Sequence, residues 1–224
     1  KICPELDSIN IGGGFPIKHS LGFEYDYQFM INEIVSNIKK ACKKAKVPMP
    51  NIYTEFGSYT VGESMAHIYS VIGQKVQNDR ECWYMIDSSF ITTLPDTWGI
   101  GEKFLMLPVN KWDNEYQRVV LGGITCDSHD YYDSEEHINE VFLPKLTNTD
   151  PKDVEGNKEP LYVGFFHTGA YQDQISGYGG IKHCLIPSPK HVIVEYDKNG
   201  KLEDWVYAKE QTAQSMLKIL GYLK

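Results

Sequence analysis

The sequence has little of what nucleic-acid-binding and membrane proteins need. Only two of its 22 basic residues are arginines, and its formal net charge at pH 7 is −8. This balance argues against broad binding to a phosphate backbone. No apolar run approaches the ~20 residues that cross a bilayer, and no low-complexity segment or internal repeat is present. The 224 residues, 42% of them hydrophobic, have the composition of one or two folded globular domains.

Cysteine is also scarce, and its pattern is informative. The five cysteines form no CxxC pair, and their number is odd: Cys3, Cys42, Cys82, Cys126 and Cys184. Wide spacing and an odd number are typical of a reduced, cytoplasmic protein rather than of a disulfide framework. The histidines show no ligand spacing either, so we predict no metal centre.

The first part of the chain has the pattern of an α/β unit. Ile9 and Ile11 indicate a short strand before a glycine run, and apolar residues three and four apart predict a helix from the N-cap Asp26 to about Lys46. A second short strand is expected at residues 52–54. Strand, helix, strand is the repeating element of a parallel sheet or barrel, and we assign residues 1–58 to it.

Residues 59–224 have a different texture. Short segments rich in β-branched and aromatic residues alternate with turn signals, at 59–72, 82–86, 118–121, 161–166, 190–196 and 202–207. Residues 197–200 read as a hairpin turn, and 148–160 as a polar loop. A helix is predicted at about 210–220 with Gly221 as its cap. We therefore expect a β-rich domain, a sandwich or barrel, that ends in one helix.

Two features follow the two predicted strands of the α/β unit. Gly12, Gly13 and Gly14 come after the first strand, and consecutive glycines let backbone N–H groups approach an anion. Their spacing fits neither the dinucleotide fingerprint nor the P-loop, and a sharp turn is the alternative. Glu55 follows the second strand, at the end where α/β barrels hold their active sites. Its alternative is a solvated loop carboxylate.

Two further segments carry reactive groups. Residues 122–130 bring together the Cys126 thiol, the Asp127 and Asp130 carboxylates and the His129 imidazole. A metal site lacks a second ligand cluster, a Cys–His nucleophile lacks a third group to orient it, and a polar turn is the remaining alternative. Tyr171, after a hydrophobic strand and two small residues, can present its hydroxyl to a site or be a structural tyrosine.

Taken in order, these segments resemble the fold type III pyridoxal-phosphate decarboxylases, which act on ornithine, arginine or diaminopimelate. The matching segments are Ile9–Pro16, Thr54–Tyr59, Thr125–Asp130 and Gly169–Tyr171. Phe165–Phe166, followed by Gly169–Gln172 and an acidic residue, resembles the biosynthetic arginine decarboxylase branch. The resemblance implies the last units of an alanine-racemase-like (β/α)8 barrel in residues 1–58, followed by the β domain.

The resemblance also implies roles for individual residues. Gly12, Gly13, Gly14 and Tyr171 would hold the phosphate of pyridoxal 5′-phosphate, and Glu55 would pair with its ring nitrogen. Cys126 would return a proton to the substrate carbon after loss of CO2. Asp127, with Asp96 as a second acid, would bind the cationic end of the substrate. In this family the site forms between two subunits, so we expect a homodimer in which Cys126 and Asp127 serve the partner's cofactor.

Two departures from the family pattern matter. Ser58 stands where the family often has an arginine on the cofactor phosphate, and no lysine here matches the motif of the Schiff-base lysine. Because the chain starts at Lys1, close to the glycine run, we expect it to be the C-terminal portion of a longer enzyme, or to work with a companion polypeptide.

The predicted function is therefore decarboxylation of a basic amino acid, L-arginine to agmatine in polyamine biosynthesis, by an enzyme of which this chain alone is inactive. The alternatives are an ornithine or diaminopimelate decarboxylase, a non-catalytic homologue that binds a partner or sequesters cofactor, and an unrelated β-rich domain with an accidental glycine loop.

Overall fold

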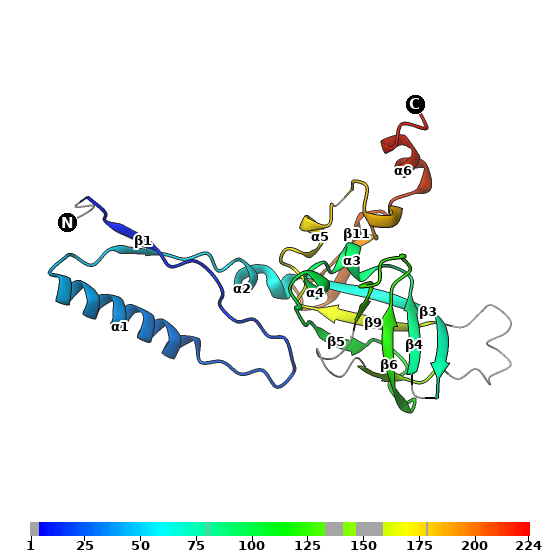
Figure 1. Cartoon of the computed structure of the whole chain (residues 1–224), viewed down its shortest axis with the longest axis horizontal. Coiled ribbons are helices and arrows are strands. Elements are labelled where there is room, and N and C mark those ends of the chain that lie inside the picture. Colours follow the sequence, from blue (N-terminus) through cyan, green and yellow to red (C-terminus); the bar gives the residue numbers. More distant parts are fainter. Residues whose placement is uncertain (1–4, 80, 133–140, 147–158, 178) are drawn as a thin grey trace.

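The computed structural model describes residues 5–79, 81–132, 141–146, 159–177 and 179–224. A small α/β unit comes first, and a larger β-rich body follows it (Figure 1). The short helix α2 (Gly57–Val61) lies between the two parts, so the chain passes from one to the other just after Glu55.

The α/β unit consists of β1 (Ser8–Asn10), α1 (Tyr27–Ala45) and β2 (Asn51–Tyr53). The two strands pair in parallel, with Ile9 opposite Ile52. The Asp26 side chain caps α1 by accepting from the Phe29 N–H at 2.8 Å. Lys46 ends the helix in the left-handed conformation, with φ of 55°. The predicted strand–helix–strand order is confirmed.

The segment after Glu55 is helical, and here the sequence prediction was wrong. A strand was expected from Tyr59, but α2 and the 3-10 turn η1 (Gly62–Ser64) precede the strand, which begins only at Ala66. The main-chain bond from Thr60 N to Phe56 O, and the bond from the Thr60 hydroxyl to the same oxygen, close the first turn. Local hydrogen bonding of this kind outweighs the β-branched composition that favoured a strand.

Among the described residues, seven strands form the main sheet. They are β3 (Ala66–Asn78), β4 (Glu81–Ile86), β5 (Leu105–Pro108), β6 (Tyr116–Gly122), β7 (Tyr131–Tyr132), β8 (Val141–Pro144) and β9 (Leu161–Phe166). The order is β5-β9-β3-β4-β6-β7, and β8 also pairs with β6. The β4–β6 pair is parallel and the other pairs are antiparallel. The predicted strands at 82–86, 118–121 and 161–166 coincide with β4, β6 and β9.

Short elements cover the ends of the sheet. They are α3 (Phe90–Thr93), α4 (Asp96–Gly99), α5 (Gln172–Ile175) and η3 (His183–Leu185). The chain then forms the separate hairpin β10 (His191–Tyr196) and β11 (Leu202–Ala208), and ends with α6 (Ala213–Ile219). The hairpin and the terminal helix were both predicted, and Gly221 follows α6 with φ of 82°. Most of the predicted polar loop at 148–160 lies outside the described residues.

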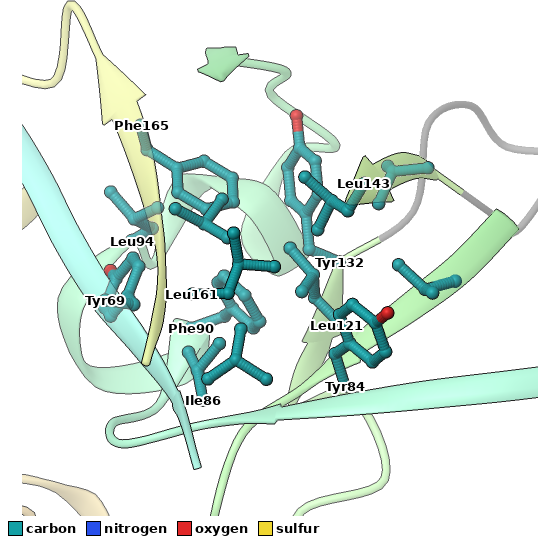
Figure 2. Close-up of a cluster of buried hydrophobic side chains, with 14 of the residues drawn as sticks. Tyr69, Tyr84, Ile86, Phe90, Leu94, Leu121, Tyr132, Leu143, Leu161 and Phe165 are labelled. Atoms are coloured by element: carbon teal, nitrogen blue, oxygen red, sulfur yellow. The ribbon is translucent and has the colours of Figure 1, made fainter. Parts of the chain in front are cut away.

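Aromatic rings build the core of the β-rich body. Phe165 of β9 contacts three other buried rings at centroid distances of 4.8 to 5.6 Å, those of Tyr132, Phe90 and Tyr69. Figure 2 shows these rings within one cluster of buried hydrophobic side chains. The alternation of buried and exposed residues at the start of β3 is typical of a strand with one face on a core. No helix among the described residues is long and apolar enough to span a bilayer.

One buried polar side chain makes the fold sensitive to acid. His67 of β3 is buried, and its Nδ1 lies 2.8 Å from the Thr168 hydroxyl. Burial lowers the pKa of His67 from 6.5 to about 4; Asp173 opposes this shift, and Lys182 and His191 add to it. The imidazole is therefore neutral in the folded protein at pH 5 and charged in the unfolded chain.

This difference predicts a loss of stability on acidification. Above pH 6.5 both states carry a neutral His67, and between pH 6.5 and 4 the unfolded state gains its proton first. The unfolding free energy should fall by about 1.4 kcal/mol per pH unit in this window. Urea unfolding at pH 7.5, 6 and 5 would measure the fall, and His67→Gln should remove most of it. Parallel pH profiles of the two proteins would contradict the assignment.

Candidate active site

The glycine loop occupies the carboxyl end of β1. Gly12 and Gly14 adopt left-handed φ values of +75° and +85°, which favour glycine over any other residue. Gly13 lies against the main-chain carbonyl of Glu55, where a Cβ atom would overlap the oxygen. The structure therefore explains why glycine stands at all three positions: the backbone conformation requires it at Gly12 and Gly14, and the nearby carbonyl requires it at Gly13.

Parallel pairing brings Glu55 beside this loop. The Ile11 N–H donates to Tyr53 O at 3.0 Å, and the Glu55 N–H donates to Gly12 O at 2.8 Å, so the ladder continues beyond the ends of both strands. Glu55 is exposed. The glycine loop and the carboxylate are thus neighbours, as the sequence predicts for consecutive strand ends.

Asn10 joins the two features, and sequence reasoning gave it no role. Its Nδ2 donates to Glu55 Oε1 at 2.5 Å, and its Oδ1 accepts from the Gly12 N–H at 2.8 Å. One amide therefore orients the carboxylate and fixes the first glycine. The sequence signal for this role was its position, because Asn10 is the last residue of β1 and lies beside the end of the neighbouring strand β2.

The loop has free donors for an anion. Within the described residues, the N–H groups of Gly13 and Gly14 donate to no other group, and both residues are exposed. A Cβ atom at Gly12 or Gly14 would meet nothing within 4 Å, so there is open space beside the backbone. Unpaired consecutive N–H groups next to a carboxylate fit a ligand with a phosphate and a protonated nitrogen. The residues present therefore fit pyridoxal phosphate.

Tyr171 reaches the same neighbourhood from the other part of the chain. A Cβ atom at Gly57, two residues after Glu55, would lie 3.7 Å from the Tyr171 hydroxyl. The tyrosine is about half exposed and has φ of 69°, which is rare for an aromatic residue. A residue held in such a backbone conformation is often found at a functional position.

A close backbone approach holds the Tyr171 segment in place. Gly169 N–H donates to Gly62 O at 2.9 Å, and a Cβ atom at Gly169 would overlap the Val61 carbonyl. Nearby, the His167 ring nitrogen lies 2.6 Å from Lys18 O. These contacts join the segment after β9 to α2 and to the loop before α1.

Asp96 lies at the start of α4, next to this segment. Its Oδ2 accepts from Gln172 Nε2 at 2.8 Å, and its N–H donates to Gln172 Oε1 at 3.3 Å. Gln172 is buried and directly follows Tyr171. Glu102 is close by, and burial raises its pKa, with a further increase from the charge of Asp96. The structure thus puts a second, unpredicted acid beside Asp96.

Cys126 and Asp127 lie on the loop after β6. The buried Asp130 organises this loop, because its carboxylate accepts from Thr125 N–H and Oγ and from Phe90 N–H of α3. The His129 N–H donates to Asp127 at 2.8 Å, and this bond lowers the pKa of the Asp127 carboxyl. Asp127 therefore stays ionised and is a third exposed to solvent.

Cys126 lies near two residues, Cys184 and His183, that the sequence does not predict to be close to this loop. Its Sγ lies 3.7 Å from that of Cys184, and His183 Nε2 is 3.6 Å from Asp127 Oδ2. The hydrogen bond with Cys184 raises the pKa of Cys126. No local pattern connects residues 58 positions apart, so only the fold could reveal this pairing. The described residues contain no cluster that could hold a metal ion.

The expected site residues thus form two groups. Gly12–Gly14, Glu55 and Tyr171 come together around α2, whereas Cys126 and Asp127 gather around η3. No hydrogen bond or ion pair joins the two groups in the described part of the chain. Asp96 belongs to neither by direct contact with these residues, but its side chain accepts a hydrogen bond from Gln172, which directly follows Tyr171.

The fold is similar to that of solved amino-acid decarboxylases. The chain resembles the biosynthetic arginine decarboxylase of Campylobacter jejuni with a TM-score of 0.76 and 20% identity, over 97% of this chain and 49% of that one. The diaminopimelate decarboxylase of M. jannaschii gives a TM-score of 0.70 at 20% identity, over 96% and 43%. At these identities the likeness shows the fold alone.

Sequence comparison points the same way. The biosynthetic arginine decarboxylase of Marinobacter nauticus is 33% identical over 142 residues, which are 62% of this chain and 20% of that protein. No family model matches the chain. The chain therefore spans about a fifth of the length of the curated relative, and it is homologous to decarboxylases of this kind over that part.

The close approach of Gly169 to the Val61 carbonyl predicts a loss of stability when residue 169 carries a side chain. Gly169→Ala should force the Val61 carbonyl away and lower the unfolding free energy by about 1–3 kcal/mol, the usual cost of overpacking. Gly73→Ala is the matched control, because a Cβ atom there meets nothing within 4 Å. Urea unfolding of both variants gives the comparison, and equal stabilities would show that the approach is not tight.

Proposed function

We propose that this chain supplies most of the contact residues of a pyridoxal-phosphate-dependent decarboxylase of basic amino acids, located in the cytoplasm. The specific reaction proposed is L-arginine to agmatine and CO2. The observation that carries the proposal is a glycine loop with free N–H groups beside a carboxylate, at the ends of two parallel strands. The similarity to biosynthetic arginine decarboxylases favours arginine as the substrate.

The cofactor group consists of the residues around α2. Gly13 and Gly14 N–H groups and the Tyr171 hydroxyl hold the phosphate, and Glu55 keeps the ring nitrogen protonated. Asn10 orients the Glu55 carboxylate through its 2.5 Å hydrogen bond. When bound, the protonated ring withdraws the electrons that the departing carboxylate leaves behind.

The substrate group consists of the loop after β6. The ionised Asp127 binds the distal guanidinium, because planar cationic groups require a charged acceptor. Asp96, whose carboxylate accepts a hydrogen bond from Gln172, is the second acid on the substrate side. The Cys126 thiol returns a proton to the substrate carbon once CO2 has left. Its raised pKa keeps it protonated at neutral pH, as a proton donor requires.

The proposal includes a partner for the α/β unit. Its sheet has two strands, and none of the residues of α1 is buried. Two strands and one uncovered helix are marginal without further cover. A segment outside these 224 residues, in the same or a companion polypeptide, would complete the barrel and bring the Schiff-base lysine. A homodimer would then pair Cys126 of one subunit with the glycine loop of the other.

The direct experiment is a decarboxylation assay on the protein together with the lysine-bearing segment. CO2 release is measured from arginine, ornithine, lysine and diaminopimelate under identical conditions. Arginine should be turned over with the highest kcat/KM. Preference for another of these substrates would overturn the arginine assignment, and release from none of them would overturn decarboxylase activity.

A non-catalytic homologue is the second candidate, and Ser58 favours it because the family often has an arginine there. Titration with pyridoxal phosphate separates the two. The enzyme should retain the cofactor, with visible absorbance, after gel filtration. A complete protein that stays colourless would support a binding or regulatory role, and Ser58→Arg would show whether the missing charge is the cause.

Loss of the Asn10 amide should weaken cofactor binding. Asn10→Ala leaves Glu55 without its hydrogen bond and frees the Gly12 N–H, and hydrogen bonds to charged groups contribute about 1.5–3 kcal/mol. The Kd for pyridoxal phosphate, measured by absorbance titration, should rise roughly tenfold or more. Asn32→Ala on α1 is the matched control, and an equal rise there would exclude a specific role.

Loss of the Cys126 thiol should change the product rather than abolish CO2 release. Cys126→Ala removes the proposed proton donor after the carboxylate has already departed. CO2 release should continue, with agmatine replaced in part by the aldehyde formed when the proton goes elsewhere. Mass spectrometry of the products measures the ratio, and Cys82→Ala on β4 is the control. Unchanged agmatine yield would remove Cys126 from the mechanism.

A further inference from the structure

Two exposed thiols from distant parts of the sequence face each other. Cys126 Sγ and Cys184 Sγ lie 3.7 Å apart, and both side chains are exposed. The other two described cysteines differ from this pair: Cys42 lies on α1 and Cys82 on β4, both half-buried. A disulfide needs the sulfur atoms about 2.05 Å apart, which two exposed side chains can reach by small rotations.

Buried groups hold both loops against the same short helix. Asp130 fixes the loop of Cys126 by accepting from the Phe90 N–H, at the start of α3. Lys182, two residues before Cys184, is buried and donates to Thr92 O of α3 at 3.5 Å and to Asp173 at 3.1 Å. Buried contacts therefore hold in place the two loops on which the thiols lie.

The backbone around Cys184 is strained. Cys184 and Leu185 have φ values of 51° and 56°, both in the left-handed region that side-chain-bearing residues avoid. Residues with side chains keep this conformation only where the surrounding structure holds them in it. The surrounding contacts maintain this conformation, and it is the one that points the Cys184 thiol toward Cys126.

A base is close to the pair. His183 Nε2 lies 3.7 Å from Cys184 Sγ and 3.6 Å from Asp127 Oδ2. Both contacts use the same ring nitrogen, so a neutral His183 with a free Nε2 can take the thiol proton, and the imidazolium that results is next to the Asp127 carboxylate. The thiolate is the form that reacts with oxidants.

We propose that Cys126 and Cys184 form a peroxide-sensitive dithiol that closes reversibly to a disulfide. The Cys184 thiolate attacks one peroxide oxygen, the O–O bond breaks, and a sulfenic acid forms as water or an alcohol leaves. The Cys126 sulfur then attacks the sulfenic sulfur and expels water. Two thiols and one hydroperoxide thus give one disulfide, one water and one molecule of water or alcohol. A thiol reductant reverses the closure.

The consequence for activity rests on the proposed function. Closure would remove the Cys126 thiol proton, so an oxidised decarboxylase would lose its proton donor. Product protonation would then depend on the redox state of the cell.

The experiment maps the bond in the purified protein and needs no activity. The reduced protein is treated with stoichiometric hydrogen peroxide, free thiols are blocked with N-ethylmaleimide, and tryptic peptides are analysed by mass spectrometry. The expected product links peptide 119–145 to peptide 183–190, disappears with dithiothreitol, and exceeds any other cysteine-linked pair by about tenfold, because closure within a preformed pair is favoured. Absence of this linked peptide, or equal amounts of other pairs, would overturn the proposal.

Cysteine variants distinguish a specific Cys126–Cys184 disulfide from non-specific oxidation of the cysteines. Cys184→Ser should abolish the linked peptide and leave Cys126 to oxidise further, whereas Cys42→Ser should leave the link intact. If Cys42→Ser also abolished it, the proposal would be wrong. The wild-type measurement stands even if a variant fails to fold. Agmatine formation before and after peroxide is a separate measurement, so failure of the decarboxylase assignment and failure of the disulfide are distinguishable.

Discussion

The close approach of Gly169 to α2 and η1 is the contact on which the arrangement of the candidate site depends. The Gly169 N–H bonds to Gly62 O, and the Thr168 N–H bonds to Met65 O, so the chain after β9 runs along the segment that follows Glu55. There is no room for a side chain at residue 169. Because Tyr171 comes two residues later, its hydroxyl arrives near Gly57. A tyrosine of the β-rich body thereby lies beside the segment that directly follows the Glu55 carboxylate.

The second group of residues depends on a different constraint, the buried charges around α3. Asp130 and Lys182 are each buried, and each is fully engaged: Asp130 with Phe90 and Thr125, Lys182 with Asp173 and Thr92 O. Buried charges remain only when hydrogen bonds satisfy them. Here they hold two surface loops to one helix, and the reactive side chains lie on those loops. Structural and reactive groups are thus adjacent in sequence but separate in role.

The sequence predicts much of the fold, because strands and helices with clear periodicity and caps coincide with the structure. Asp26, Pro48 and Gly221 mark the ends of helices through local chemistry alone. The strand expected at 59–72 was partly wrong because Thr60 bonds back to Phe56 O and starts a helix. In the candidate site, the residues with motif neighbours were predictable. Asn10, Gln172 and Cys184 were not, because their partners lie 45, 76 and 58 residues away in the sequence.

The separation of the two groups follows from the topology. The glycine loop belongs to the parallel β1–β2 pair, whereas the Cys126 loop follows β6, on the far side of β3 and β4 from β9 in the sheet. The two groups of side chains are therefore held by different elements of the fold, and no hydrogen bond or ion pair joins them among the described residues. In the homodimer proposed above, a second copy would bring them together, because a two-fold interface makes two equal sites.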